Sequence, residues 1–65
     1  MKVYPRYSPG DMLQNLDSPI PVVFIVVDSY WTNGGYTYEM FAPDVPHKTY
    51  YKREYNLTAN YKVIG

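Results

Sequence analysis

Residues 22–27 read Val-Val-Phe-Ile-Val-Val, and this run decides the fold class. β-Branched side chains lose rotational freedom in a helix but pack well on a pleated sheet. The run has the length of a strand, and it follows Pro21, which cannot donate a backbone hydrogen bond. Because both alternating sets of its side chains are apolar, we expect a central strand covered on two sides.

The same strand is expected to continue to Trp31 and then to fold back on itself. Residues 32–35 read Thr-Asn-Gly-Gly, and Asn and Gly tolerate the positive φ angles that tight hairpin turns require. Residues 36–41, Tyr-Thr-Tyr-Glu-Met-Phe, follow as the partner strand. The sequence therefore predicts a hairpin over residues 22–41.

The rest of the chain is divided by proline-rich loops at residues 17–21 and 42–46. The expected strands cover residues 12–16, 22–31, 36–41, 48–55 and 61–64. Asn56 can cap a single helical or 3₁₀ turn over residues 56–60. We expect an N-terminal extended arm over residues 1–9 and one domain over residues 10–65. Five short strands avoid open edges by closing into a small barrel, so an all-β barrel is predicted.

Two motifs resemble SH3-like barrels. Gly10-Asp11-Met12-Leu13 is similar to the Gly-Asp-hydrophobic opening of bacterial and phage members. Residues 57–64, Leu-Thr-Ala-Asn-Tyr-Lys-Val-Ile, are similar to the 3₁₀ turn and last strand of SH3 domains, where an Asn-Tyr pair precedes an apolar strand. The likeness covers most of residues 8–65 and is closest in style to small uncharacterised SH3-like proteins encoded by phages. It implies a five-stranded SH3-like barrel with a single 3₁₀ turn before the last strand.

The chain departs from the peptide-binding members of that family. It lacks their ALYDY-like first strand and their acidic RT loop, and Trp31 is no clean counterpart of their paired tryptophan. We therefore do not expect this chain to recognise proline-rich peptides as those members do.

Composition argues against catalytic chemistry. The 65 residues include no Cys and one His, His47, so neither a disulfide framework nor a histidine–thiolate zinc site can form. Asp28 and Glu39 are expected to be a cross-strand surface pair rather than an acid–base pair. The Gly34-Gly35 dipeptide lies in a hairpin turn, with no helix after it to hold a phosphate. We expect no enzyme activity, no cofactor and no metal.

The formal net charge is zero, but it is unevenly distributed. Residues 1–46 carry two cations against five carboxylates, a net charge of −3, whereas residues 47–65 carry four cations against one carboxylate, a net charge of +3. This split indicates either a solvated surface whose halves happen to differ or a basic patch near the C-terminal strands.

Nine Tyr, two Phe and one Trp supply twelve aromatic rings for the core and for contact surfaces. Trp31 and Tyr36 flank the hairpin turn, where they either pack on each other or form an exposed tip suited to a protein partner. In the expected strand 48–55, Tyr51, Arg53 and Tyr55 share one face. Rings interleaved with cations can stack bases and follow phosphates, although a strand with core tyrosines on one side and polar residues on the other gives the same pattern.

Our preferred hypothesis is a non-enzymatic interaction or structural module, phage-encoded in keeping with the resemblance, that binds another protein or self-assembles. The alternative is a weak single-stranded nucleic-acid-binding barrel that uses Tyr51, Arg53 and Tyr55 together with Lys48 and Lys62. No apolar run approaches the roughly 20 residues of a membrane span, and no apolar segment follows the N-terminal cations as in a signal peptide. We therefore expect a cytoplasmic protein, in the host cytoplasm or the virion if a phage encodes it.

Overall fold

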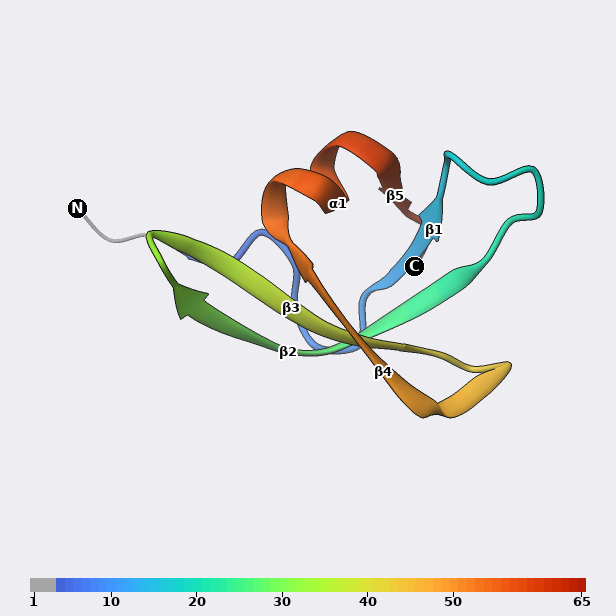
Figure 1. Ribbon diagram of the computed structural model, residues 1–65, viewed down its shortest axis with the longest axis horizontal. Coiled ribbons are helices and arrows are strands. Elements are labelled where there is room, and N and C mark those ends of the chain that lie inside the picture. Colours follow the sequence, from blue (N-terminus) through green and yellow to red (C-terminus); the bar gives the residue numbers. More distant parts are fainter. Residues whose placement is uncertain (1–3) are drawn as a thin grey trace.

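The computed structural model describes residues 4–65, which form five strands and one short helix (Figure 1). The elements in chain order are β1 (Met12–Asn15), β2 (Val23–Thr32), β3 (Gly35–Ala42), β4 (Val45–Arg53), α1 (Glu54–Asn60) and β5 (Tyr61–Val63). The strands form a single sheet in the order β4-β3-β2-β1-β5, and every neighbouring pair is antiparallel. The predicted all-β class is thus confirmed.

The sheet is not closed, contrary to the prediction. β4 and β5 are its two edges, and α1, which connects them directly, contacts both of these strands and β3. Figure 1 shows α1 on one side of β2, β3 and β4, close to β5. The helix therefore lies where the expected barrel would have joined its last strands, and it buries Leu57 completely.

The hairpin is confirmed in detail. Trp31 pairs with Tyr36 and Thr32 with Gly35, which leaves Asn33 and Gly34 as the two central residues of the turn. Their φ angles are 49° and 78°. Positive values at both positions match the twist of the flanking strands, which is why Asn-Gly is favoured there.

A β-bulge at Val27 changes which side chains of β2 point inward. The register with β3 shifts between Val26 and Asp28, so Val27 has no partner and is exposed. Before the bulge, Phe24 and Val26 point into the core. After it, Asp28 and Tyr30 lie on the opposite, solvent-exposed side, as expected when an extra residue interrupts a two-residue period.

The expectation that β2 is covered on two sides is wrong. Helix α1 covers one face of the sheet, and no described element covers the other. Ile25, on that second face, is partly exposed, whereas Val26 is buried.

The segment around residue 54 also differs from the prediction. The strand expected over residues 48–55 begins earlier, at Val45, and ends at Arg53; the 3₁₀ turn expected at 56–60 is a seven-residue α-helix that begins at Glu54. Asn56 lies inside this helix and does not cap it. The reason is tertiary, because the Glu54 side chain is held by residues that are distant in the sequence.

Part of the expected arm over residues 1–9 lies outside the described residues, namely 1–3. In the described part, Tyr7 is buried and packs edge-to-face against Tyr38, with ring centroids 5.2 Å apart. Gly10, with a φ of 95°, donates its N–H to Val26 O at 2.8 Å, which fixes the segment against β2.

The core consists of one cluster of buried side chains from the N-terminal segment, three strands and α1. Its members are Tyr7, Leu13, Phe24, Val26, Tyr38, Met40, Ala42 and Leu57. A domain of this size buries only about 60% of its unfolded surface, so each core contact contributes appreciably to stability.

The Tyr38 hydroxyl connects the centre of this core to two other parts of the chain. The Tyr38 side chain is fully buried, and its hydroxyl donates a hydrogen bond to Glu54 Oε1 at 2.5 Å. The Tyr38 hydroxyl oxygen itself accepts hydrogen bonds from the N–H groups of Arg6 at 2.8 Å and Tyr7 at 3.3 Å. Burial, together with the hydrogen bond to Glu54, raises the pKa of Tyr38 to about 12.

We expect Tyr38→Phe to lower the free energy of unfolding by about 2 kcal/mol, because the variant keeps the ring but removes the acceptor of the buried Tyr7 N–H and the donor to Glu54. Urea unfolding followed by circular dichroism measures the change. Tyr30→Phe is the matched control: it removes an exposed hydroxyl, and its effect on the free energy of unfolding should be much smaller than that of Tyr38→Phe. Equal losses in the two variants would contradict this role for Tyr38.

Stability should also fall as the pH rises from about 10 towards 12. In this range a tyrosine of the unfolded chain ionises near pH 10, whereas folded Tyr38 keeps its proton until about pH 12. The folded state binds more protons, so the free energy of unfolding decreases with pH and the stabilising contribution is lost as the folded pKa is passed. Urea midpoints measured between about pH 9 and 11.5 should fall less steeply for Tyr38→Phe than for the wild type; parallel curves would refute this.

Candidate interaction surface

The hairpin end carries the first predicted pair of contact residues. The rings of Trp31 and Tyr36 lie edge-to-face with centroids 5.0 Å apart, so the interpretation that they pack on each other across the turn is confirmed. Tyr36 also packs against the core. Trp31 remains 54% exposed.

The second predicted group does not lie on one strand face. Tyr51 pairs with Glu39 and Arg53 pairs with Thr37, so these two share a face of β4, but Tyr55 belongs to α1. Tyr55 is 74% exposed and Tyr51 is 61% exposed. The prediction that all three side chains form one row is therefore wrong, because β4 ends before Tyr55.

Arg53 fastens β4 to the hairpin end. Its Nη1 donates to Thr32 O at 2.8 Å, Thr32 Oγ1 at 2.7 Å and Thr37 Oγ1 at 2.9 Å. The guanidinium group lies over Gly35, where an added Cβ would be 2.8 Å from Nη2. Gly35 thus provides the space for a side chain whose position is set by the fold, and Arg53 acts first as a structural residue.

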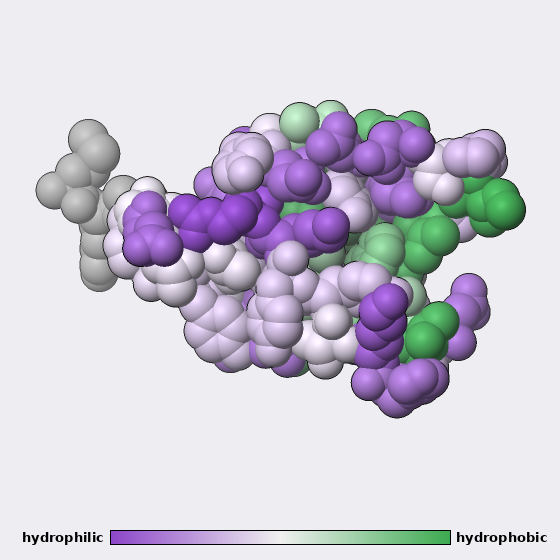
Figure 2. All heavy atoms as spheres, viewed as in Figure 1, coloured by the Kyte–Doolittle hydropathy of each residue, from purple (hydrophilic) through white to green (hydrophobic). Residues whose placement is uncertain are grey.

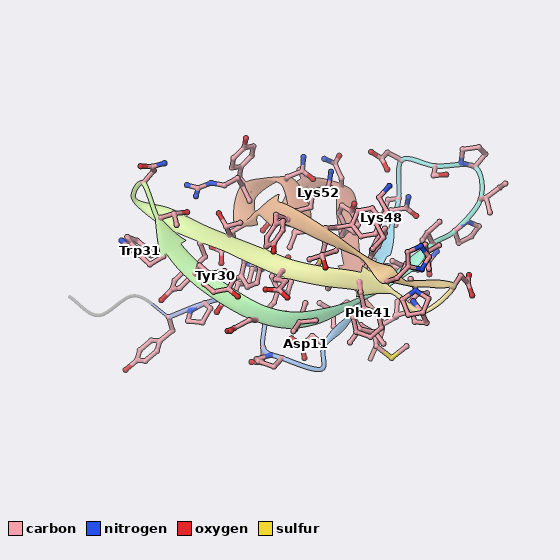
Figure 3. All side chains as sticks on the ribbon, turned by 60° about the horizontal axis from the view of Figure 1, so that its bottom comes forward. Asp11, Tyr30, Trp31, Phe41, Lys48 and Lys52 are labelled. Carbon is pink, nitrogen blue, oxygen red and sulfur yellow. The ribbon has the colours of Figure 1, made fainter. Side chains whose placement is uncertain are left out.

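The cations of residues 47–65 do not gather on one face of the sheet. Lys48 Nζ lies 5.0 Å from the centroid of the Tyr50 ring, and Lys52 pairs with Tyr38 on the same side of β4. Lys62 lies on β5, at the other edge of the sheet, and pairs with Gln14 of β1. Figure 3 shows Lys48 and Lys52 on the side of α1, whereas Tyr30 and Phe41 lie on the opposite side.

This opposite side of β2, β3 and β4 brings together two exposed rings and two carboxylates. We call it the outer face and define it by Asp28, Tyr30, Thr37, Glu39 and Tyr51. Asp28 and Glu39 are direct cross-strand partners, as predicted. The Tyr30 hydroxyl donates to Glu39 Oε1 at 2.6 Å, and this hydrogen bond is the main reason that the pKa of Tyr30 is raised to about 12.

Tyr30 was not among the residues singled out from the sequence. It could have been found by counting residues from the turn: once Trp31 is placed opposite Tyr36, Tyr30 lies opposite Thr37 and on the same face as Glu39. The position of Tyr51 next to Glu39 depends on the pairing of β3 with β4. That pairing is interrupted by a register shift between Met40 and Ala42, which no sequence pattern indicates.

Within residues 4–65, no ion pair places a cation against the carboxylates of the outer face. Among the described residues, the register partners of Glu39 are Asp28 and Tyr51. Arg53 is its diagonal neighbour, but the guanidinium group is held at Thr32 and Thr37. Two carboxylates therefore stand opposite each other, an arrangement that destabilises a sheet.

Apolar side chains are exposed elsewhere. Figure 2 shows hydrophobic atoms gathered towards the end of the molecule that holds the loop after β1, where Leu16 and Ile20 are exposed. On the uncovered side of the sheet, Met12, Ile25 and Phe41 are paired in register across β1, β2 and β3.

Comparison with known proteins adds no assignment: no protein-family model, curated protein or solved structure matches the chain. Within residues 4–65, no group of three or more His, Asp or Glu side chains is placed to hold a metal ion. A search of the same residues finds no helix with the length and apolar character needed to cross a membrane.

We expect Asp28→Asn to raise the free energy of unfolding by about 0.5 kcal/mol, because it removes one of two opposed like charges. Asn can still accept the Ser29 N–H that Asp28 Oδ1 accepts at 2.8 Å. Urea unfolding at low salt measures the gain, which should shrink as added salt screens the charges. Asp17→Asn, in the exposed loop after β1, makes the same charge change and should have little effect; a loss of stability in Asp28→Asn would contradict the repulsion.

Proposed function

We propose that this chain is a non-enzymatic protein-interaction module of SH3-like topology, which binds a partner protein through its outer face. The observation that carries the proposal is that two tyrosine rings, Tyr30 at 42% exposure and Tyr51 at 61%, lie beside Glu39 on the two strands that neighbour β3. Tyrosine is enriched at protein interfaces because its ring supplies contact area while its hydroxyl keeps a polar partner.

The order of elements supports an SH3-like relationship. A short first strand, a loop, a long hairpin, a further strand, one helical segment and a short last strand follow one another as the sequence motifs imply. In our proposal this is an SH3-like fold whose sheet stays open between β4 and β5, with α1 lying between those edges.

The rings of the outer face are also pre-positioned. The Tyr30 hydroxyl is fixed by its hydrogen bond to Glu39, and Tyr51 stands on a strand whose end is fastened by Arg53. Little side-chain freedom is then lost on binding, which lowers the entropic cost of association.

The nucleic-acid alternative receives less support. A single-stranded nucleic-acid surface needs stacking rings and cations along one groove. Here Tyr55 lies on a different element from Tyr51, Arg53 is engaged within the hairpin, and Lys48 and Lys62 lie on opposite edge strands. The two carboxylates of the outer face would repel phosphates.

The proposal is tested by affinity capture from a lysate of the cells in which the protein occurs, with the wild type beside Tyr51→Ala and Tyr55→Ala. We expect Tyr51→Ala to reduce recovery of the bound protein about tenfold, the usual range for an aromatic interface anchor. Tyr55→Ala removes a ring that is equally accessible but lies on α1, and it should retain the partner.

Two results would refute this function. Recovery that is unchanged in Tyr51→Ala would exclude the outer face as the contact surface. Recovery that disappears after nuclease treatment, and falls steeply between about 50 and 200 mM salt, would favour the nucleic-acid alternative.

A further inference from the structure

We propose that the outer face accepts a lysine or arginine side chain from a basic segment of the partner protein, with Asp28 and Glu39 as the counter-charges and Tyr30 and Tyr51 as the flanking rings. This inference rests on the proposed function, since it names the chemistry of the partner that the same surface would bind.

Charge complementarity selects a cation as the occupant. Asp28 and Glu39 are direct register partners, Asp28 exposed and Glu39 partly exposed. Only one oxygen of each is used by the hydrogen bonds of the described residues: Asp28 Oδ1 by Ser29 N–H and Glu39 Oε1 by the Tyr30 hydroxyl. The second oxygen of each carboxylate is left to face solvent. A cation placed between them would relieve their repulsion and form charge-assisted hydrogen bonds, which are about twice as strong as neutral ones.

The tyrosine rings also favour a cation as the ligand, through cation–π attraction. β3 lies between β4 and β2, so Glu39 has Tyr51 directly beside it on β4 and Tyr30 diagonally beside it on β2. Each ring presents an electron-rich face that attracts an ammonium or guanidinium group within about 6 Å. Carboxylates and rings on three adjacent strands thus favour one ligand chemistry.

The three cations of β4 do not fill this position. Lys52 and Lys48 project from the α1 side of β4, and Arg53, the nearest cation on this side of the sheet, is bound to Thr32 and Thr37. Moving the Arg53 side chain onto Glu39 would break the three hydrogen bonds that it donates to Thr32 and Thr37. Among residues 4–65, no cation of β4 is therefore free to occupy the outer face, and our proposal takes the occupant from a partner protein.

The test is fluorescence anisotropy with the full chain and a fluorescein-labelled peptide of alternating lysine and serine; a peptide of alternating glutamate and serine is the control ligand. We expect the wild type to bind the lysine peptide and not the glutamate peptide. Glu39→Gln should weaken binding about tenfold, because it removes the charge but can still accept the Tyr30 hydroxyl. Tyr51→Ala should weaken it about threefold. Asp17→Asn changes the net charge by the same amount outside the outer face, and it should stay within about twofold of the wild type.

The inference is overturned if the wild type fails to bind the lysine peptide at millimolar concentration, or if Asp17→Asn weakens binding as much as Glu39→Gln. The capture assay separates this failure from failure of the proposed function. If recovery of the partner falls in Tyr51→Ala but is unchanged in Glu39→Gln, the proposed function is supported and the cation-binding role is refuted. If Tyr51→Ala recovers as much of the partner as the wild type does, both the proposed function and the cation-binding role are refuted.

Discussion

The hydroxyl group of Tyr38 is the constraint on which the rest of the structure depends. It lies at the end of a fully buried side chain, so it must be hydrogen-bonded inside the protein, and its partners come from two other parts of the chain, the N-terminal segment and the start of α1. By accepting two backbone N–H groups of the N-terminal segment and donating to Glu54, it fixes where that segment crosses the core and where α1 begins. Because the helix starts at Glu54, Leu57 reaches the core, and β5 follows directly to pair with β1.

The outer face is a consequence of the bulge at Val27. Without the extra residue, the inward set of β2 would continue along its even-numbered positions, and Tyr30 would point into the core instead of towards solvent. With it, Tyr30 joins Glu39 and Tyr51 on one exposed surface, while Trp31 packs on Tyr36 at the hairpin end. A local irregularity in one strand therefore separates the side chains that build the core from those that are available to a partner.

Under the proposed function, this surface would trade stability for binding. A small domain gains little from its core, yet here it places Asp28 opposite Glu39, where a neutral pair would be more stable. Natural proteins break one or two such local rules at functional sites, which is consistent with the proposed role of this face. Arg53, which could have neutralised Glu39, is instead hydrogen-bonded to Thr32 and Thr37, because three hydrogen bonds that hold the edge strand β4 to the hairpin end do more for the fold than one partly exposed ion pair.

The sequence by itself determined the hairpin, because its information is local. A β-branched run from residue 22, Asn33-Gly34 at the turn and alternating rings after it specify two strands and their register, and the pairing of Trp31 with Tyr36 and of Asp28 with Glu39 followed from that register. The tertiary structure alone decided what happens after residue 53. Local preference would have continued the strand through Tyr55 and placed a cap at Asn56, but the buried Tyr38 hydroxyl draws Glu54 to the start of a helix. It likewise decided that the sheet stays open and that Tyr51 joins Tyr30 on one face, because these depend on contacts between residues far apart in the chain, which periodicity and turn chemistry do not encode.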